Sequence, residues 1–327
     1  MDKGWQQLLA AFLLGALLPN LMLNMGRYTP YDLLGSPETV PTQSQQPTQG
    51  YEAVDSIPVL TDTGSIRVMD LESYILGVVL AEMPASFEEE TLKAQAVVAR
   101  SYALRRMSLG DRHVGCAVCT EPSCCQAYIS EEAYLETRGS RDDVEKIRRA
   151  VSATAGQVLT YAGQLAEATY FSCSGGRTED ALAVWGGNVP YLQAVDSPGE
   201  ENAPAYEAAV YFTKERFAAA LERNLSGSPG QWLGKVTYTD GGGVATMFIG
   251  GISYTGTDLR KRLGLNSTAF SMTADANGIT VTTRGKGHRV GMSQYGAEAM
   301  AVNGSTFEEI LTYYYPGTEI DNYSEIE

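Results

Sequence analysis

The stretch DLESYILGVVLAEMPASFEEETLKAQAVVARSYAL, residues 70–104, predicts two consecutive helices joined by a short break. Apolar side chains recur at helical spacing after Asp70, which stands where a helix N-cap is expected. Pro84 ends this first helix, because a proline interrupts the helical hydrogen-bond pattern. Ser86 then opens the second helix, with Glu89 three residues later as the partner of a capping box. This helix pair is the best-defined starting point for the fold.

A single carboxylate, Glu82, falls on the apolar face at the end of the first helix. The negative end of the helix dipole and burial both disfavour its ionised form. A carboxyl that stays protonated near neutral pH is what a general acid requires. Lys93 and Arg100, seven residues apart on the second helix, would oppose this if their charges reach it. An ordinary ion pair between Glu82 and Arg100 is therefore the alternative.

Length and charge limit the classes of function. The chain has 327 residues, of which 44% are hydrophobic, enough for one large domain or two moderate ones. Its 24 basic and 39 acidic groups give a formal net charge of −15. A nucleic-acid-binding protein needs a basic surface for phosphates, so this function is not expected.

The N-terminal residues 1–27 are expected to anchor the protein in a membrane. The apolar stretch from Trp5 to Met25 contains no charged residue and has about the ~20 residues needed to cross a hydrocarbon core. A cleaved signal peptide is the alternative, since Leu8 to Leu18 has the length of a signal-peptide hydrophobic region. No clear small-x-small cleavage site follows it, which favours a single-pass anchor.

A polar segment, residues 28–60, follows the anchor and includes SPETVPTQSQQPTQG. It is rich in Pro, Thr, Gln and Ser and lacks apolar periodicity, so it cannot bury enough surface to order itself. We expect a flexible linker here and a globular domain over residues 61–327.

The rest of the chain predicts an α+β fold. After a third amphipathic helix, short β-like runs alternate with glycine-rich breaks, as in KVTYTDGGGVATMFIGG. The regular alternation of strand and helix that marks a dinucleotide-binding sheet is absent from this pattern. The helices expected beyond the first pair cover residues 142–154, 213–225, 257–263 and 307–315.

Several ordered blocks of sequence resemble the SpoIID/LytB family. The blocks are GVVLAEMPASFEEETLKAQAVVARSYAL, YFSCSGGRTEDALAVWGGNVPYLQAVDSP, LRKRLGLNSTAF and GKGHRVGMSQYGAEAMAVNGSTFEEILTYYYPGTEI. The resemblance runs from about Ile66 to Ile320, and several long blocks in order are more specific than one short motif. It implies a mixed α+β catalytic core with a smaller inserted unit, expected over residues 188–270.

The resemblance also implies a function, because SpoIID proteins are lytic transglycosylases of peptidoglycan, particularly of glycan strands without stem peptides. Glu82 would then be the catalytic acid and base. It would protonate the oxygen between N-acetylmuramic acid and N-acetylglucosamine, then take the proton of the muramoyl 6-hydroxyl as a 1,6-anhydro ring closes. Because an internal hydroxyl replaces water, one carboxylate suffices where glycosidases usually need two.

Further polar side chains are candidates for binding the glycan, from the resemblance and from their patterns. They are Lys93, Arg100, Tyr170, Ser172, Ser174, His288, Gln294 and Tyr295. The alternatives are solvated helix charges for the two basic residues, an ordinary strand and turn for the serines, and a turn-stabilising hydrogen bond for His288. The family usually has glycine where Arg289 stands, so the turn at His288 departs from the family pattern.

Four of the five cysteines crowd together between Cys116 and Cys125. His113, Cys119 and Cys125, spaced six apart, resemble the zinc ligands of some SpoIID members, and thiolates with an imidazole suit tetrahedral zinc. A zinc ion would order this short loop, with Cys116 or Cys124 as a possible fourth ligand. A disulfide or free thiols are the alternatives.

Two other functions remain open from the sequence. Cys173 could act as a nucleophile with His288 as its base and cut peptide stems. Alternatively, the chain could be a LytB-like amidase enhancer that binds glycan without cleaving it. The intact AEMP block around Glu82 and the expected anchor both favour the lytic enzyme.

The resemblance also places the protein in a cellular setting. It implies a role in septal peptidoglycan remodelling and engulfment during sporulation, with the catalytic domain outside the cytoplasm. The expected partners are peptidoglycan glycan strands, a SpoIIP-like amidase, a SpoIIM-like membrane scaffold and the membrane itself, but no nucleic acid.

Overall fold

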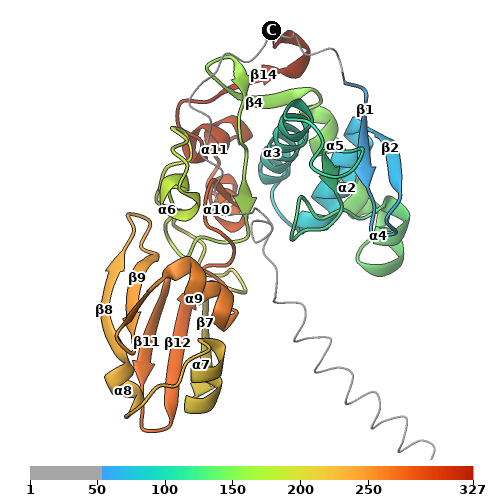
Figure 1. The fold of residues 1–327 in the computed structure, drawn as a ribbon. Coiled ribbons are helices and arrows are strands. Elements are labelled where there is room, and N and C mark those ends of the chain that lie inside the picture. Colours follow the sequence, from blue (N-terminus) through green and yellow to red (C-terminus); the bar gives the residue numbers. More distant parts are fainter. Residues whose placement is uncertain (1–53, 327) are drawn as a thin grey trace, which may run out of the picture.

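The computed structural model describes residues 54–326, which form helices and five small sheets around three hydrophobic cores (Figure 1). The predicted α+β class is confirmed. The expected anchor, residues 1–27, and most of the expected linker lie outside the described residues. Within residues 54–326, no helix combines the length and the apolar character that a membrane span requires.

The first predicted helix is present as α2, Leu71–Glu82. Asp70 caps it as expected, because its carboxylate accepts a hydrogen bond of 2.8 Å from the Ser73 N–H. The helix ends just before Pro84, where Met83 takes an extended backbone conformation. Glu82 is therefore the last helical residue, with no further turn to cover its carboxyl group.

The second helix, α3, spans Glu89–Ser108, and its predicted N-terminus is wrong. Glu88 is the N-cap, and no capping box forms at Ser86. A residue distant in sequence replaces it: the carboxylate of Glu298 accepts hydrogen bonds of 2.8 Å from the Glu88 N–H and the Thr91 hydroxyl. A tertiary contact from Glu298 therefore caps the N-terminus of α3, in place of the local capping box that was expected.

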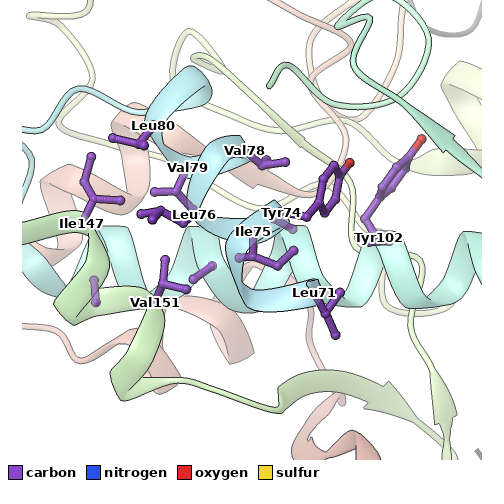
Figure 2. Packing of buried hydrophobic residues seen from close by; sticks show 14 of the residues in the cluster. Leu71, Tyr74, Ile75, Leu76, Val78, Val79, Leu80, Tyr102, Ile147 and Val151 are labelled. Carbon is purple, nitrogen blue, oxygen red and sulfur yellow. The ribbon is translucent and has the colours of Figure 1, made fainter. Parts of the chain in front are cut away.

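The first core packs α2 and α3 against α5, Arg141–Ala153, with α4, Glu131–Thr137, at its side. Figure 2 shows side chains of α2 packed toward Ile147 and Val151 of α5. The sheet beside it joins β1, Ser56–Leu60, antiparallel to β2, Ile66–Asp70, and parallel to β3, Val118–Cys119.

Strand β1 corrects the predicted end of the linker. It lies inside the segment 28–60, yet Ile57 and Val59 are completely buried in the first core. The run SIPVL is only five residues long and contains a proline, so it gave little signal of a strand. The folded part of the chain therefore begins at β1 rather than after residue 60.

Helix α3 also borders the second core, so it is buried on two faces. Leu92, Ala96 and Ala99 face the first core, whereas Ala94 and Val97 face the second. Small alanine side chains let neighbouring elements approach the helix closely. The helix is thereby fixed on both sides of the region where α2 ends.

The second core contains two small sheets and three helices. Strand β4, Gln157–Tyr161, pairs antiparallel with β5, Gln164–Leu165, and with β14, Glu319–Asn322. Strand β6, Tyr170–Phe171, pairs parallel with β13, Met292–Ser293. The helices are α6, Ala181–Trp185, α10, Gln294–Val302, and α11, Phe307–Tyr314, and a 3₁₀ turn, η1, Tyr323–Glu325, follows β14.

The third core belongs to a smaller lobe at one end of the molecule (Figure 1). Its two antiparallel sheets have the strand orders β10-β9-β8 and β11-β12-β7. The elements run from residue 207 to residue 284, because β12 pairs with β7 and closes the unit; the predicted insertion, 188–270, overlaps this range. The elements are β7, Glu207–Thr213; α7, Lys214–Ala220; α8, Pro229–Trp232; β8, Leu233–Tyr238; β9, Val244–Ile249; β10, Ile252–Thr255; α9, Gly256–Leu263; β11, Phe270–Ala274; and β12, Gly278–Arg284.

Candidate active site

Glu82 is held by two hydrogen bonds that reach the same carboxyl oxygen. Its Oε1 accepts from the Ala127 N–H at 2.8 Å and from the Tyr170 hydroxyl at 3.3 Å. The Gln294 amide lies beside it, with Nε2 3.5 Å from the Glu82 backbone carbonyl. The side chain is partly exposed. Oε1 is therefore fixed by the protein, the Gln294 side chain is a further hydrogen-bond partner of the carboxyl group, and the partial exposure of Glu82 leaves the group within reach of a substrate.

The pKa of Glu82 is raised from its ordinary value, as expected for a general acid. Burial is the main cause. The hydrogen bonds from Ala127, Tyr170 and Gln294 and the positive charge of Arg138 lower the pKa only in part. The protonated form is therefore favoured at the end of α2.

Tyr170 connects Glu82 to a buried residue that the sequence analysis missed, Gln126. The Tyr170 hydroxyl lies 3.1 Å from Gln126 Oε1, and Gln126 Nε2 donates to the Tyr74 hydroxyl at 3.3 Å and to the Ala99 carbonyl at 3.4 Å. Burial and the nearby Glu82 raise the pKa of Tyr170 well above its ordinary value, so it remains a neutral donor. A glutamine between two cysteines and an aromatic residue carries no periodic signal that could have marked it.

Helix α10 brings the two residues predicted at its start to this site. Its N-cap, Ser293, accepts from the Gly296 N–H. Gln294 donates to Gln95 at 3.4 Å. The Tyr295 N–H donates to the Ser172 carbonyl at 3.1 Å, and the Tyr295 ring packs edge-on against Phe87. Gln294, Tyr295, Ser172 and Tyr170 thus gather near the end of α2.

Ser174 does not face a position that a glycan could occupy. It is completely buried, and its hydroxyl donates to Glu200 at 2.7 Å. Glu200, which the sequence analysis also missed, accepts further hydrogen bonds from Ser197, Ser293 and the backbone N–H groups of residues 174 and 175. Ser174 is therefore corrected from a glycan contact to part of the support beneath the loop.

Arg100 is also corrected. Its side chain is completely buried and makes a bidentate ion pair with Glu72, at 2.8 and 2.6 Å, and a bond of 2.9 Å to the Gln157 carbonyl. It can neither touch a glycan nor pair with Glu82. Lys93 is partly exposed and bonds Glu90 at 2.7 Å.

His288 stabilises a turn through a hydrogen bond, which was the alternative to glycan binding. Its Nδ1 accepts from the Val290 N–H at 3.1 Å, and its ring packs against Phe171 and Trp185. Burial, with the charge of Arg260, lowers its pKa to about 3, so the imidazole is neutral. Its occupied Nδ1 cannot also serve as a base.

The neighbouring Arg289 explains how this turn tolerates a residue other than glycine. Its φ of 67° is left-handed, which costs a side chain some strain. The buried guanidinium offsets this by pairing with Glu179 at 3.2 Å and donating to the carbonyls of Ser174, Arg177 and Gly241 at 2.7 Å each. The bond to Gly241 ties the turn to the smaller lobe.

Cys173 is a poor nucleophile in this structure. It is completely buried, and burial raises the pKa of its thiol to about 11. Its backbone pairs with Lys286. The structure therefore gives no support to a Cys173–His288 peptide hydrolase.

The predicted cysteine cluster comes together. The donor atoms of His113, Cys119, Cys124 and Cys125 lie within 4.8 Å of one another. His113 Nε2 is 3.8 Å from the Cys124 sulfur and 3.5 Å from the Cys125 sulfur, and the two sulfurs are 3.9 Å apart. Tetrahedral zinc with Zn–S bonds of about 2.3 Å needs sulfurs about 3.8 Å apart, so this donor set fits.

Cys116 lies outside that cluster, which leaves Cys124 as the fourth donor. All five cysteines are described, and none forms a disulfide. Two residues after Cys125 comes Ala127, whose N–H donates to Glu82. The cysteine loop therefore leads directly into the backbone that holds the candidate catalytic carboxyl.

The protein therefore has an α+β fold, and its candidate active site places the Glu82 carboxyl group beside a cysteine-rich loop. The SpoIID family model, described as stage II sporulation protein, matches residues 60–161. Stage II sporulation protein D of Bacillus subtilis (strain 168) is 43% identical over 272 residues, covering 81% of this chain and 78% of that protein. The protein of the same name from Bacillus amyloliquefaciens is 38% identical, covering 85% and 82%.

The chain therefore belongs to the SpoIID family of sporulation proteins. It is also related to the amidase enhancer of Bacillus subtilis (strain 168), at 27% identity over 76% of this chain and 40% of that protein. The predicted family is thereby confirmed.

Proposed function

We propose that this protein is a lytic transglycosylase that cleaves the bond between N-acetylmuramic acid and N-acetylglucosamine in peptidoglycan strands, preferably strands without stem peptides. The observation that carries the proposal is Glu82: its pKa is raised, its Oε1 is fixed by two hydrogen bonds, and its side chain is exposed enough for a substrate to reach it. Family membership supports the assignment to the cell wall of sporulating cells.

The reaction uses this one carboxyl group twice. Protonated Glu82 gives its proton to the glycosidic oxygen as the bond to the muramoyl carbon breaks. The resulting carboxylate then accepts the proton of the muramoyl 6-hydroxyl, whose oxygen closes the 1,6-anhydro ring. Ala127 and Tyr170 stabilise the charge that Glu82 carries between these steps.

The surroundings of Glu82 suit a mechanism with one carboxylate. Its hydrogen-bond partners in residues 54–326 are a backbone N–H, a phenol and the Gln294 side-chain amide, and the groups beyond them are amides and another phenol. No second carboxylate belongs to this hydrogen-bonded group. Hydrolytic glycosidases usually need a second one to activate water or attack the sugar.

We further propose that His113, Cys119, Cys124 and Cys125 hold a structural zinc ion. A bound zinc would fix the loop, while the proposed chemistry needs no metal-activated water. Ordering of this loop would also position the Ala127 N–H that donates to Glu82, because Ala127 lies only two residues after Cys125.

The cellular setting is proposed from the family and from the sequence of the N-terminal segment. We expect a single-pass membrane anchor with the catalytic domain outside the cytoplasm, where peptidoglycan lies. The proposed role is septal remodelling and engulfment, with a SpoIIP-like amidase and a SpoIIM-like scaffold as partners. Protease added to protoplasts should cleave the described domain, and complete protection would contradict this topology.

The substitution Glu82→Gln tests the proposed activity. The amide keeps the volume of the carboxyl but cannot donate the proton, so the rate on amidase-treated strands should fall by about 10²–10⁴-fold. Glu89→Gln is the matched control, since Glu89 is an acid with a half-exposed side chain whose ion pair is a 3.7 Å contact with Lys93; it should retain the parent rate. A Glu82→Gln protein that cleaves within a fewfold of the parent would refute the assignment.

The relation to the amidase enhancer supports a second candidate, a non-catalytic protein that binds glycan and stimulates an amidase. The same pair of variants separates the two functions. An enhancer would stimulate a purified amidase equally well with Glu82→Gln, and neither protein alone would shorten glycan strands.

A further inference from the structure

One hydroxyl proton at the site has two acceptors. The Tyr170 oxygen lies 3.3 Å from Glu82 Oε1 and 3.1 Å from Gln126 Oε1. A phenol has a single proton to donate, and a glutamine oxygen and an ionised carboxylate can only accept. Tyr170 therefore cannot satisfy both partners at the same moment.

The orientation of Gln126 is fixed by its other contacts. Its Nε2 lies 3.4 Å from the Ala99 carbonyl, which can only accept a hydrogen bond, and 3.3 Å from the Tyr74 hydroxyl. The amide nitrogen must therefore face Ala99, and Oε1 must face Tyr170. The side chain is 1% exposed, so bulk water does not reach it as a substitute partner.

We propose that Gln126 is a positioning residue that competes with Glu82 for the hydroxyl proton of Tyr170, so that this hydroxyl turns from one acceptor to the other during the reaction. The inference rests on the proposed role of Glu82 as acid and base. It adds a residue from the cysteine loop that acts on Glu82 through Tyr170 without touching the substrate.

The turn of the hydroxyl follows the charge of Glu82. While Glu82 is protonated, Tyr170 donates to Gln126. When Glu82 gives its proton to the glycosidic oxygen, the new carboxylate is the stronger acceptor and the hydroxyl turns to it. When Glu82 takes the proton of the 6-hydroxyl, Tyr170 returns to Gln126. The Tyr170 proton never leaves its oxygen, so the proton count balances.

The other groups that face this pair do not change partners in the same way. Ala127 donates its N–H to Glu82 in either state. The Arg138 guanidinium donates to the Ala81 carbonyl at 3.2 Å, and the Gln294 amide has no proton to exchange with Glu82. Around Tyr170, burial raises the pKa of both Tyr74 and Tyr102, so these phenols remain neutral. Tyr170 is the group whose acceptor depends on Glu82.

The first test uses the unaltered full-length protein in detergent. Tyrosine labelled with ¹³C at Cζ and glutamate labelled at Cδ are followed by NMR across a pH titration. The Tyr170 and Glu82 signals are identified by their loss in Tyr170→Phe and Glu82→Gln. The Tyr170 signal should shift with the same midpoint as Glu82, and should not shift in Glu82→Gln. A Tyr170 signal that ignores the ionisation of Glu82 would overturn the proposal.

The second test removes the competing acceptor. Gln126→Met has a similar volume but cannot accept the phenol proton well, so Tyr170 is committed to Glu82. The midpoint of the Glu82 titration should fall by about one pH unit. The alkaline limb of the cleavage rate should fall with it.

Gln95→Met is the matched control, because Gln95 is a completely buried glutamine that contacts Gln294 rather than Tyr170. It should leave the response of Tyr170 to Glu82 unchanged. Equal shifts in both variants, or no shift in Gln126→Met, would contradict the proposal. The titrations do not depend on cleavage, so a failure of the proposed activity would be distinguished from a failure of this inference. Should Gln126→Met not fold, the titration of the unaltered protein decides alone.

Discussion

Two carboxyl groups adjoin the strand pair β6–β13, and the protein treats them differently. Glu200 is 1% exposed, and both of its oxygens are occupied: Oε2 accepts from Ser174 and two backbone N–H groups, and Oε1 accepts from Ser197 at 2.6 Å and Ser293 at 2.5 Å. Glu82 is partly exposed, and the hydrogen bonds from Ala127 and Tyr170 both reach its Oε1. Glu200 thus serves the fold, whereas Glu82 stays within reach of a substrate.

The comparison shows what separates a supporting acid from a reacting one in this protein. A buried carboxyl group whose two oxygens both accept hydrogen bonds from the protein has no oxygen left to contact a substrate. A carboxyl that is desolvated but only partly bonded favours its protonated form. Both lie near the same two strands, so the difference comes from hydrogen-bond supply rather than from their location in the fold.

The same substitution at both positions should give the largest contrast in stability. Glu200→Ala leaves buried donors without an acceptor and should lower the free energy of unfolding by about 3–5 kcal/mol. Glu82→Ala should cost less than about 1 kcal/mol, because water can reach the partly exposed site and replace the lost acceptor. Urea-induced unfolding of the full chain measures both. Similar losses of unfolding free energy in the two variants would contradict the different roles given to Glu200 and Glu82.

Loss of the proposed zinc ion should have the next largest effect, since it would loosen the loop that supports Glu82. Cys119→Ser should abolish bound zinc and lower the melting temperature by roughly 5–10 °C. Cys116→Ser is the matched control, because Cys116 is buried but lies outside the cluster. It should keep its zinc. Metal analysis and thermal unfolding measure the two effects. A purified parent protein that contains no zinc and has normal stability would contradict the proposed zinc site.

The pH dependence of stability should show a smaller effect, which comes from the raised pKa of Glu82. The folded state raises the pKa of Glu82, so it binds the proton more tightly than the unfolded chain does. This contribution to stability is complete below the ordinary pKa of 4.5 and is lost as pH rises through the raised folded value. Glu82→Gln should therefore unfold at a higher temperature than the parent at neutral pH, with the difference shrinking on acidification. A difference that grows toward acid would show that Glu82 is stabilised as an anion.

The sequence predicted those parts of the structure that local pattern controls. The spacing of apolar residues after Asp70 and the proline at position 84 placed α2 and put Glu82 at its end. The resemblance of His113, Cys119 and Cys125 to the zinc ligands of some SpoIID members predicted the cluster, whose residues belong to one short loop. The terminal helix α11 also begins and ends close to its predicted limits.

What the sequence did not predict depends on contacts between distant segments. The acid in the stretch SPGEE gives no sign that Glu200 will be buried by loops from residues 174, 197 and 293. Arg100 looked available to the site because its spacing matches Lys93, but Glu72 lies within reach on α2. Similarly, the start of α3 depends on Glu298, more than two hundred residues away.

The central claim is that one carboxyl group, Glu82, closes an anhydro ring without using water. Digestion of denuded glycan strands by the full-length protein in water enriched with ¹⁸O, followed by mass spectrometry of the new ends, tests it most directly. The account predicts 1,6-anhydro-muramoyl ends that are lighter by one water and carry no ¹⁸O. New reducing ends that contain one ¹⁸O atom would show hydrolysis instead and would contradict the claim.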